Sequence, residues 1–307
     1  MKHFGWLNCL AMMAVVCLLT MVSCERLEMD EENGGTGTKV TFRVTAFEQV
    51  PFGQGASREW VVSRAGGTEL GEACSRMNLS VFRGDEKVKS VSQKSTDADF
   101  GQVSLSLPEG NYTVVVIGHS CDGSATITSP EKVTFPNNKV TDMFYWCDDL
   151  EVGSAGLTQD VELERAVSMF RLVVTGTIPS NVACMKFYYT GGSSTFCPLT
   201  GYGNVNSRQT VNLDVQDGVR DGDRTSFDVF TCLHADRGTL KMTVTALDAA
   251  DNTIAERVFE DVGMQRNMIT RYTGDFFATG GGGSGSSSGT FSMKVQAEWD
   301  DILDESY

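Results

Sequence analysis

Short runs in which apolar and polar residues alternate recur along this chain. In the first clear run, Val40, Phe42 and Val44 alternate with Thr41 and Arg43. Successive side chains of a strand point to opposite faces, so a period of two predicts a strand with one buried face. About ten windows show alternation or a short apolar run, and none shows sustained helical periodicity. The sequence therefore predicts an all-β protein.

Turn residues separate these runs, which favours antiparallel strands packed as a β-sandwich. In the first half we expect strands near residues 40–46, 77–81, 88–91, 103–107, 112–116, 125–128, 133–135 and 143–146. In the second half we expect them near 161–163, 170–174, 186–189, 211–213, 229–233, 240–247 and 254–259. The first two strands of the second half meet at a basic residue, Arg165. A long loop, about residues 48–68, follows the first strand and carries Arg58 and Arg64; loops of that length in a compact domain are usually functional or processed.

The length of 307 residues allows two domains of ordinary size. The break at 153–156, with the sequence Gly-Ser-Ala-Gly, separates an N-terminal sandwich at 39–152 from a C-terminal one at 157–307. A glycine- and serine-rich run at 280–289 precedes a final strand at 291–299. We therefore expect two β-sandwiches in tandem.

The first 23 residues have the layout of a secretory signal, with Lys2 ahead of an apolar run from Trp6 to Val22. The sequence Met-Val-Ser-Cys at 21–24 resembles a lipobox, which implies cleavage before Cys24 and acylation of that residue. Residues 24–38 are acidic and end in glycines, as in a solvated tether. We expect a lipid anchor in the outer membrane; the alternative is an ordinary signal that ends near a cysteine.

The formal net charge of −15 argues against nucleic acid as a partner. The six cysteines after Cys24 contain no Cys-x-x-Cys pair, so we expect buried thiols and leave one or two disulfides open. They are Cys74, Cys121, Cys147, Cys184, Cys197 and Cys232.

The sequence does not assemble a catalytic, metal or cofactor site. His119 and His234 have no ligand neighbours at strand or helix spacing, so each is expected to be a surface or strand histidine. Asp217, Asp221 and Asp223 depart from the calcium-loop spacing and favour a solvated turn. The Gly-Ser-Ser-Ser-Gly sequence at 285–289 matches a nucleophile elbow only formally, because it lies in a linker. We expect no enzyme and no cofactor.

The segments 159–172 (QDVELERAVSMFRL) and 265–277 (QRNMITRYTGDFF), behind the lipobox, resemble the FimB family of fimbrial lipoproteins. The resemblance covers nearly the whole mature chain. It implies two transthyretin-like, Greek-key sandwiches and a structural role in cell-surface fimbriae. The implied partners are other fimbrial subunits, which bind by strand addition, and the outer membrane.

The resemblance leaves the place within the fimbria open. In shaft subunits of this kind an arginine-specific protease cuts after the first strand, which implies Arg58 or Arg64 here. A base anchor instead keeps its lipid and its first strand, and this is the role we favour. A shaft or tip subunit is one alternative. The other is a glycan-binding surface lipoprotein, with Trp60, Tyr202 and Tyr272 as candidate platform residues.

Replacing Cys24 with Ala tests the anchor directly. Without the thiol no acyl chain can be attached, so the variant is expected to leave the outer-membrane fraction and to change its gel mobility. Cell fractionation with immunoblotting measures both. A variant that stays membrane-bound with unchanged mobility would refute lipidation.

Overall fold

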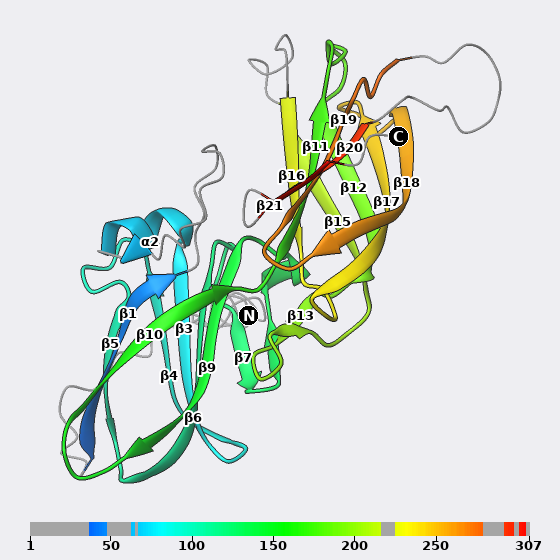
Figure 1. The fold of residues 1–307 in the computed structure, drawn as a ribbon. Coiled ribbons are helices and arrows are strands. Elements are labelled where there is room, and N and C mark those ends of the chain that lie inside the picture. The colour runs from blue at the N-terminus through cyan, green and yellow to red at the C-terminus, as the bar shows by residue number, and fades with distance from the viewer. Residues whose placement is uncertain are drawn as a thin grey trace, which may run out of the picture. The chain divides into compact units, whose positions relative to one another are not determined.

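Strands make up most of the described chain, which confirms the all-β prediction (Figure 1). The computed structural model describes residues 37–47, 63–64, 67–215, 225–278, 292–297 and 301–304. Within these ranges the helical segments are the short helix α2 (Gly67–Ala73) and the single turn η1 (Pro136–Asn138). Neither these nor any other described segment forms a helix long and apolar enough to cross a membrane.

The first group consists of two sets of strands that share one apolar core. The first set is β5–β1–β10, in which β1 pairs in parallel with β10 and antiparallel with β5. The other set is β4–β3–β6–β9, all antiparallel. The bounds are β1 Thr38–Phe47, β3 Arg76–Arg83, β4 Glu86–Lys94, β5 Gln102–Leu107, β6 Gly110–His119, β9 Met143–Val152 and β10 Leu157–Arg165.

The second group repeats the pairings within each set. Within the described residues it lacks a counterpart of the β9–β10 pairing that joins the two sets of the first group into one sheet through Glu164↔Tyr145 and Arg165↔Phe144. Here β11 pairs in parallel with β19 and antiparallel with β16, while β15–β12–β17–β18 form the antiparallel set. The bounds are β11 Ser168–Val174, β12 Cys184–Gly192, β15 Ser207–Asp214, β16 Thr225–Thr231, β17 Arg237–Leu247, β18 Thr253–Gln265 and β19 Ile269–Gly274. In each group of seven strands the first strand therefore lies between the seventh and the fourth.

The strand that follows the expected boundary at 153–156 lies in the first group, not at the start of the second. β10 pairs with β1, and its Val161 and Leu163 belong to the same apolar cluster as Val40 and Phe42. The second group begins with β11, immediately after Arg165-Ala166-Val167. The Gly-Ser-Ala-Gly segment at 153–156 therefore connects two strands of the first group, β9 and β10; turns and linkers use the same residues. Division into two domains stays a prediction, and residues from Gly37 onward group as one compact unit.

Each group encloses its own apolar cluster, and a third cluster draws on both. This junction cluster contains Phe82, Ile117 and Met143 from the first group and Phe196 and Cys232 from the second. A small sheet also crosses between the groups, because β8 pairs with β13 through Thr134↔Thr195 and Val133↔Phe196. The strands of this sheet are β7 Thr126–Ser129, β8 Lys132–Thr134, β13 Thr195–Cys197 and β14 Tyr202–Gly203.

The C-terminal segment adds strands to the second group. β20 (Ser292–Ala297) pairs antiparallel with β19, and β21 (Asp301–Asp304) pairs with β20. The expected strand at 291–299 is thus confirmed over 292–297. Residues 291 and 298–300 lie outside the described ranges.

His119, at the end of β6, is fully buried in a polar network. Its Nδ1 accepts the N–H of Cys121 at 3.1 Å, so the ring proton lies on Nε2, which donates to Asn78 Oδ1 at 2.9 Å. The N–H of Ala125 also donates to Asn78 Oδ1, at 3.0 Å. Burial, with a smaller contribution from the charge of Arg76, lowers the pKa of His119 to about 4. The strand expectation for His119 is confirmed.

The lowered pKa of His119 predicts a loss of stability in acid. Above pH 6.5 the ring is neutral in both states, whereas between pH 6.5 and 4 only the unfolded chain takes up the proton. Moving from pH 7.5 to 4.5 should cost about 2.5 kcal/mol of unfolding free energy through this residue, at ~1.4 kcal/mol per pKa unit. His119→Gln should be less stable at pH 7.5 but should lose less on acidification. Urea unfolding at both pH values measures this, and identical losses would contradict it.

Candidate functional site

The first strand, β1, is held along both of its edges. On one edge it runs parallel to β10, with Val40 opposite Leu157, and on the other it runs antiparallel to β5, with Val40 opposite Leu105. Thr41 Oγ1 and Ser104 Oγ lie 2.9 Å apart across the second pairing. The short strand β2 (Ser63–Arg64) pairs with the end of β1, after the pairing with β5 has ended at Arg43. We call the position of β1 between β10 and β5 the β1 slot.

The inward face of β1 is fully apolar and closed to solvent. Val40, Phe42 and Val44 are 0, 2 and 7% exposed, while Lys39 and Arg43 on the other face are exposed. Withdrawing the strand would uncover about 5–8 kcal/mol of apolar burial at 1.5–3 kcal/mol per buried side chain. That is comparable to the whole stability of an ordinary domain, so the slot has to be filled.

Both ends of the slot are fixed by specific contacts. At the start of β1, Thr38 Oγ1 donates to the carbonyl of Gly153 at 2.6 Å. Further along, the N–H of Val44 donates to the carbonyl of Gly101 at 2.8 Å. Gly101 has φ of +89°, and an added Cβ would lie 2.9 Å from the Leu70 side chain of α2, so only glycine fits there. The register of the occupying strand is therefore set at two points.

The expected lipidation and processing residues fall at or before this site. Cys24 and Arg58 lie outside the described residues. Arg64 lies in β2, where it is opposite Ala46 of β1 in an antiparallel ladder. The sequence did not indicate β2, because a strand of two residues is too short to show an alternation of apolar and polar side chains.

The candidate aromatic platform is not assembled by the described residues. Tyr272 is 9% exposed and packs with Phe170 and Phe259 in the core, so its assignment to a surface platform is wrong. Tyr202 is half-buried, and the guanidinium of Arg266 lies 5.6 Å from its ring centre. Trp60 lies outside the described ranges.

The remaining titratable residues do not come together for chemistry. His234 is exposed, with its Nδ1 2.9 Å from the carbonyl oxygen of Gly203. No group of described His, Cys, Asp or Glu side chains could hold a metal ion. Asp217, Asp221 and Asp223 lie outside the described residues. The six cysteines are all free, and burial raises the pKa of Cys74, Cys147 and Cys232 to about 12, which keeps these thiols unreactive.

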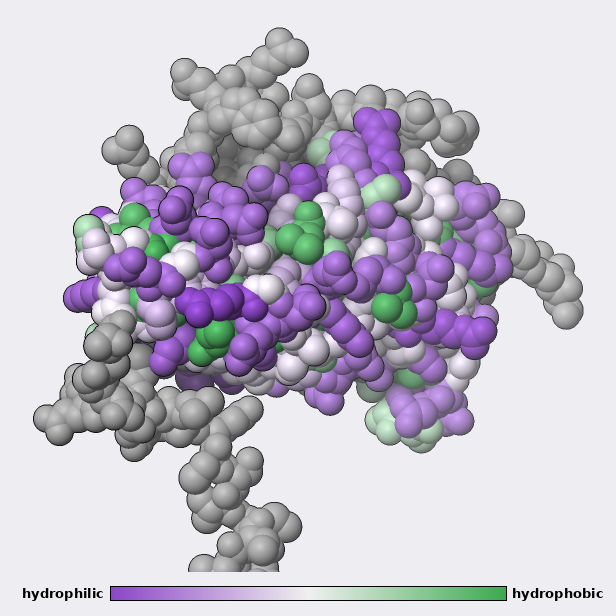
Figure 2. All heavy atoms as spheres, turned by 90° about the horizontal axis from the view of Figure 1, so that it is seen from below, coloured by the Kyte–Doolittle hydropathy of each residue, from purple (hydrophilic) through white to green (hydrophobic). Residues whose placement is uncertain are grey.

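The surface seen in Figure 2 is largely hydrophilic, with apolar residues scattered among polar ones. The large hydrophobic side chains that are exposed in the described residues are Tyr188, Leu199, Val205 and Val258. Scattered apolar residues are normal on a soluble surface. The arrangement best suited to recognition is therefore the β1 slot, which binds an extended backbone and alternate side chains.

These features define a β-sandwich protein whose N-terminal strand is built into the interior of a sheet. The chain belongs to the family of unknown function DUF6562, whose pattern matches residues 32–305. No curated protein matches it significantly.

Solved structures resemble the chain at low sequence identity. A candidate polysaccharide-binding protein (DUF1812) from Bacteroides thetaiotaomicron has a TM-score of 0.52 and 10% identity, with 87% of this chain and 99% of the other covered. A candidate adhesin from Bacteroides ovatus has a TM-score of 0.50 and 12% identity, with 87 and 94% covered. The fimbrial anchor protein Mfa2 from Porphyromonas gingivalis, at 12% identity and with 88 and 100% covered, reaches a TM-score of 0.42. The first two values indicate a shared fold.

Phe42→Ala tests how much the buried face of β1 contributes to the unfolding free energy. Truncating this 2% exposed ring should lower the unfolding free energy by about 3–5 kcal/mol, since it removes burial and leaves a cavity. Arg43→Ala, on the exposed face of the same strand, is the matched control and should change stability by less than about 0.5 kcal/mol. Denaturant unfolding measures both. Equal effects would mean that the described face of β1 is not the one that holds the strand.

Proposed function

We propose that this protein is a structural subunit of cell-surface fimbriae, anchored in the outer membrane through a lipid on Cys24. The observation that carries the proposal is the β1 slot. A single strand, joined to a lipobox-like N-terminus through an acidic tether, fills an apolar position between β10 and β5. A neighbouring fimbrial subunit that supplies an extended segment would bind such a position by strand addition.

The descriptions of the similar structures support a role at the cell surface. The two structures with TM-scores of 0.52 and 0.50 come from Bacteroides species, one described as a candidate polysaccharide-binding protein and the other as a candidate adhesin. Neither description is of an enzyme. The FimB-like segments at 159–172 and 265–277 narrow this surface role to fimbriae.

Within the fimbria, we propose the base anchor and keep the shaft or tip subunit as the alternative. An anchor keeps its first strand, and in this structure β1 is paired on both edges and buried on its inward face. Arg64 lies in a strand that pairs with β1, and a protease reads a backbone poorly while it is paired in a ladder. Arg58 is therefore the better processing candidate if the chain is cleaved.

The matching strand order of the two groups supports tandem transthyretin-like sandwiches. Each has its first strand paired in parallel with its seventh, and each encloses a large apolar cluster. With β10 in the first sandwich, we place the division after Arg165.

Glycan binding at the cell surface is the second candidate function, because one of the two structures that share the fold is described as a candidate polysaccharide-binding protein. Binding of the purified protein to a glycan panel would favour it. Tyr202→Ala would then test the remaining described member of the proposed platform.

N-terminal sequencing of the protein taken from assembled fimbriae separates the anchor from the shaft. The anchor is expected to start at the acylated Cys24 and to retain β1. A chain that starts at Glu59 or Ala65 would refute the anchor and indicate a polymerising subunit that has lost β1. Absence of the protein from purified fimbriae and from their cell-surface base would refute the fimbrial role itself.

A further inference from the structure

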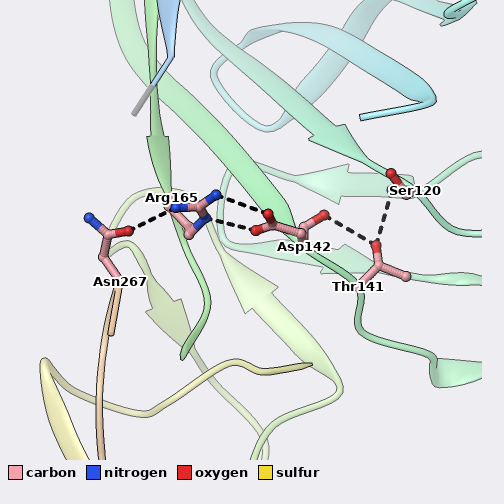
Figure 3. Close-up of polar contacts among 5 residues, drawn as sticks. All are labelled: Ser120, Thr141, Asp142, Arg165 and Asn267. Carbon is pink, nitrogen blue, oxygen red and sulfur yellow. Dashed lines mark hydrogen bonds and ion pairs between the residues drawn. The ribbon is translucent and has the colours of Figure 1, made fainter. Parts of the chain in front are cut away.

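Three kinds of contact join the two groups of strands. The junction cluster contributes apolar burial, and the β8–β13 pairing contributes a short ladder. The third kind is polar. Arg266 of the second group donates to the hydroxyl of Tyr145 at 3.2 Å and pairs with Glu164 at 3.5 Å, at a partly exposed position. The fully buried polar contact centres on Arg165, the last residue of β10, just before the chain enters β11 (Figure 3). Its side chain is 1% exposed, which makes it the largest fully buried side chain of the described chain.

Arg165 binds one side chain from each group. Its Nε and one terminal nitrogen donate to the two carboxylate oxygens of Asp142, at 2.8 and 3.0 Å, just ahead of β9 in the first group. Its other terminal nitrogen donates to the Oδ1 of Asn267 at 3.2 Å, in the turn between β18 and β19 of the second group. The guanidinium also lies 4.8 Å from the ring centre of Phe144.

Both partners of Arg165 are themselves held in place. Asn267 is 8% exposed, has a left-handed φ of 57°, and donates its N–H to the carbonyl of Val167 at 2.9 Å. Behind Asp142, the carbonyl of that residue accepts from Thr141, whose hydroxyl accepts the N–H of Ser120 (Figure 3). The contacts thus run continuously from the loop after β6, through Arg165, to the turn before β19.

The planar fork of a guanidinium constrains direction in a way that apolar contact does not. The junction cluster would tolerate small rotations of one group against the other, because hydrophobic burial is non-directional. The forked pair with Asp142 and the bond to Asn267 are satisfied together in one orientation. A buried charge left without its partners is strongly unfavourable, so that orientation is favoured over its neighbours.

We infer that Arg165 is a junction lock: one buried guanidinium that couples the two groups of strands into a single rigid and cooperatively unfolding unit. The lock does not touch the β1 slot and does not depend on the proposed function. The chain offers a matched comparison in Arg171, whose forked pair with Asp228, at 2.6 and 2.7 Å, joins β11 to β16 within the second group alone.

Differential scanning calorimetry of the full chain tests the lock. The unaltered protein should unfold in one transition, with equal calorimetric and van't Hoff enthalpies. Arg165→Met should split it into two transitions, and the van't Hoff enthalpy of each should be about half that of the original, since each covers about half the residues. Arg171→Met should shift the melting temperature and keep a single transition.

The outcome is decided by the number of transitions, not by the melting temperature. A single transition in Arg165→Met, at whatever temperature, would overturn the lock, as would two transitions in the unaltered protein. Splitting in both Arg165→Met and Arg171→Met would also overturn it, because the effect would then follow the loss of any forked pair. If Arg165→Met does not fold, Asn267→Gly replaces it, because glycine keeps the left-handed backbone and removes only the side chain. Two transitions are then expected for Asn267→Gly.

Discussion

The parallel pairing of the first with the seventh strand of each seven-strand group is the constraint on which this structure depends. It occurs twice, as β1 with β10 and as β11 with β19, and each time the first strand is also paired on its other edge. A strand in this position belongs to the centre of a sheet although it comes first in the chain.

This arrangement makes the first core dependent on the N-terminal end of the described chain. A lipid or a protease acting ahead of or just behind β1 acts on a strand whose three inward side chains close the core of the first group. Loss of that strand would leave the core of the first group open to solvent. The short ladder between β2 and β1 adds backbone bonds next to the loop on which such a loss would depend.

The two groups of strands are joined by contacts other than those of their own cores. Their own cores are separate clusters, whereas the junction combines apolar burial, two residue pairs of β-sheet, a partly exposed ion pair of Arg266 with Glu164 and the contacts of one buried arginine, Arg165. Burial and strand pairing hold the two groups together, and the inferred role of the guanidinium is to fix the orientation of one group relative to the other.

Alternation of side chains determined the all-β fold, the inward face of β1 and the meeting of two strands at Arg165, because a period of two records which face is buried. It could not decide which strands pair. β10 therefore went to the wrong group, since a tight turn within a sandwich and a linker between sandwiches use the same residues. Tyr272 was misplaced for a similar reason: an aromatic ring looks the same in sequence whether it lies in a core or on a platform. Only the tertiary structure brought Asp142 and Asn267, 125 positions apart along the chain by their numbers, to the same guanidinium. Such contacts depend on strands that are distant in sequence folding side by side, and no local pattern encodes them.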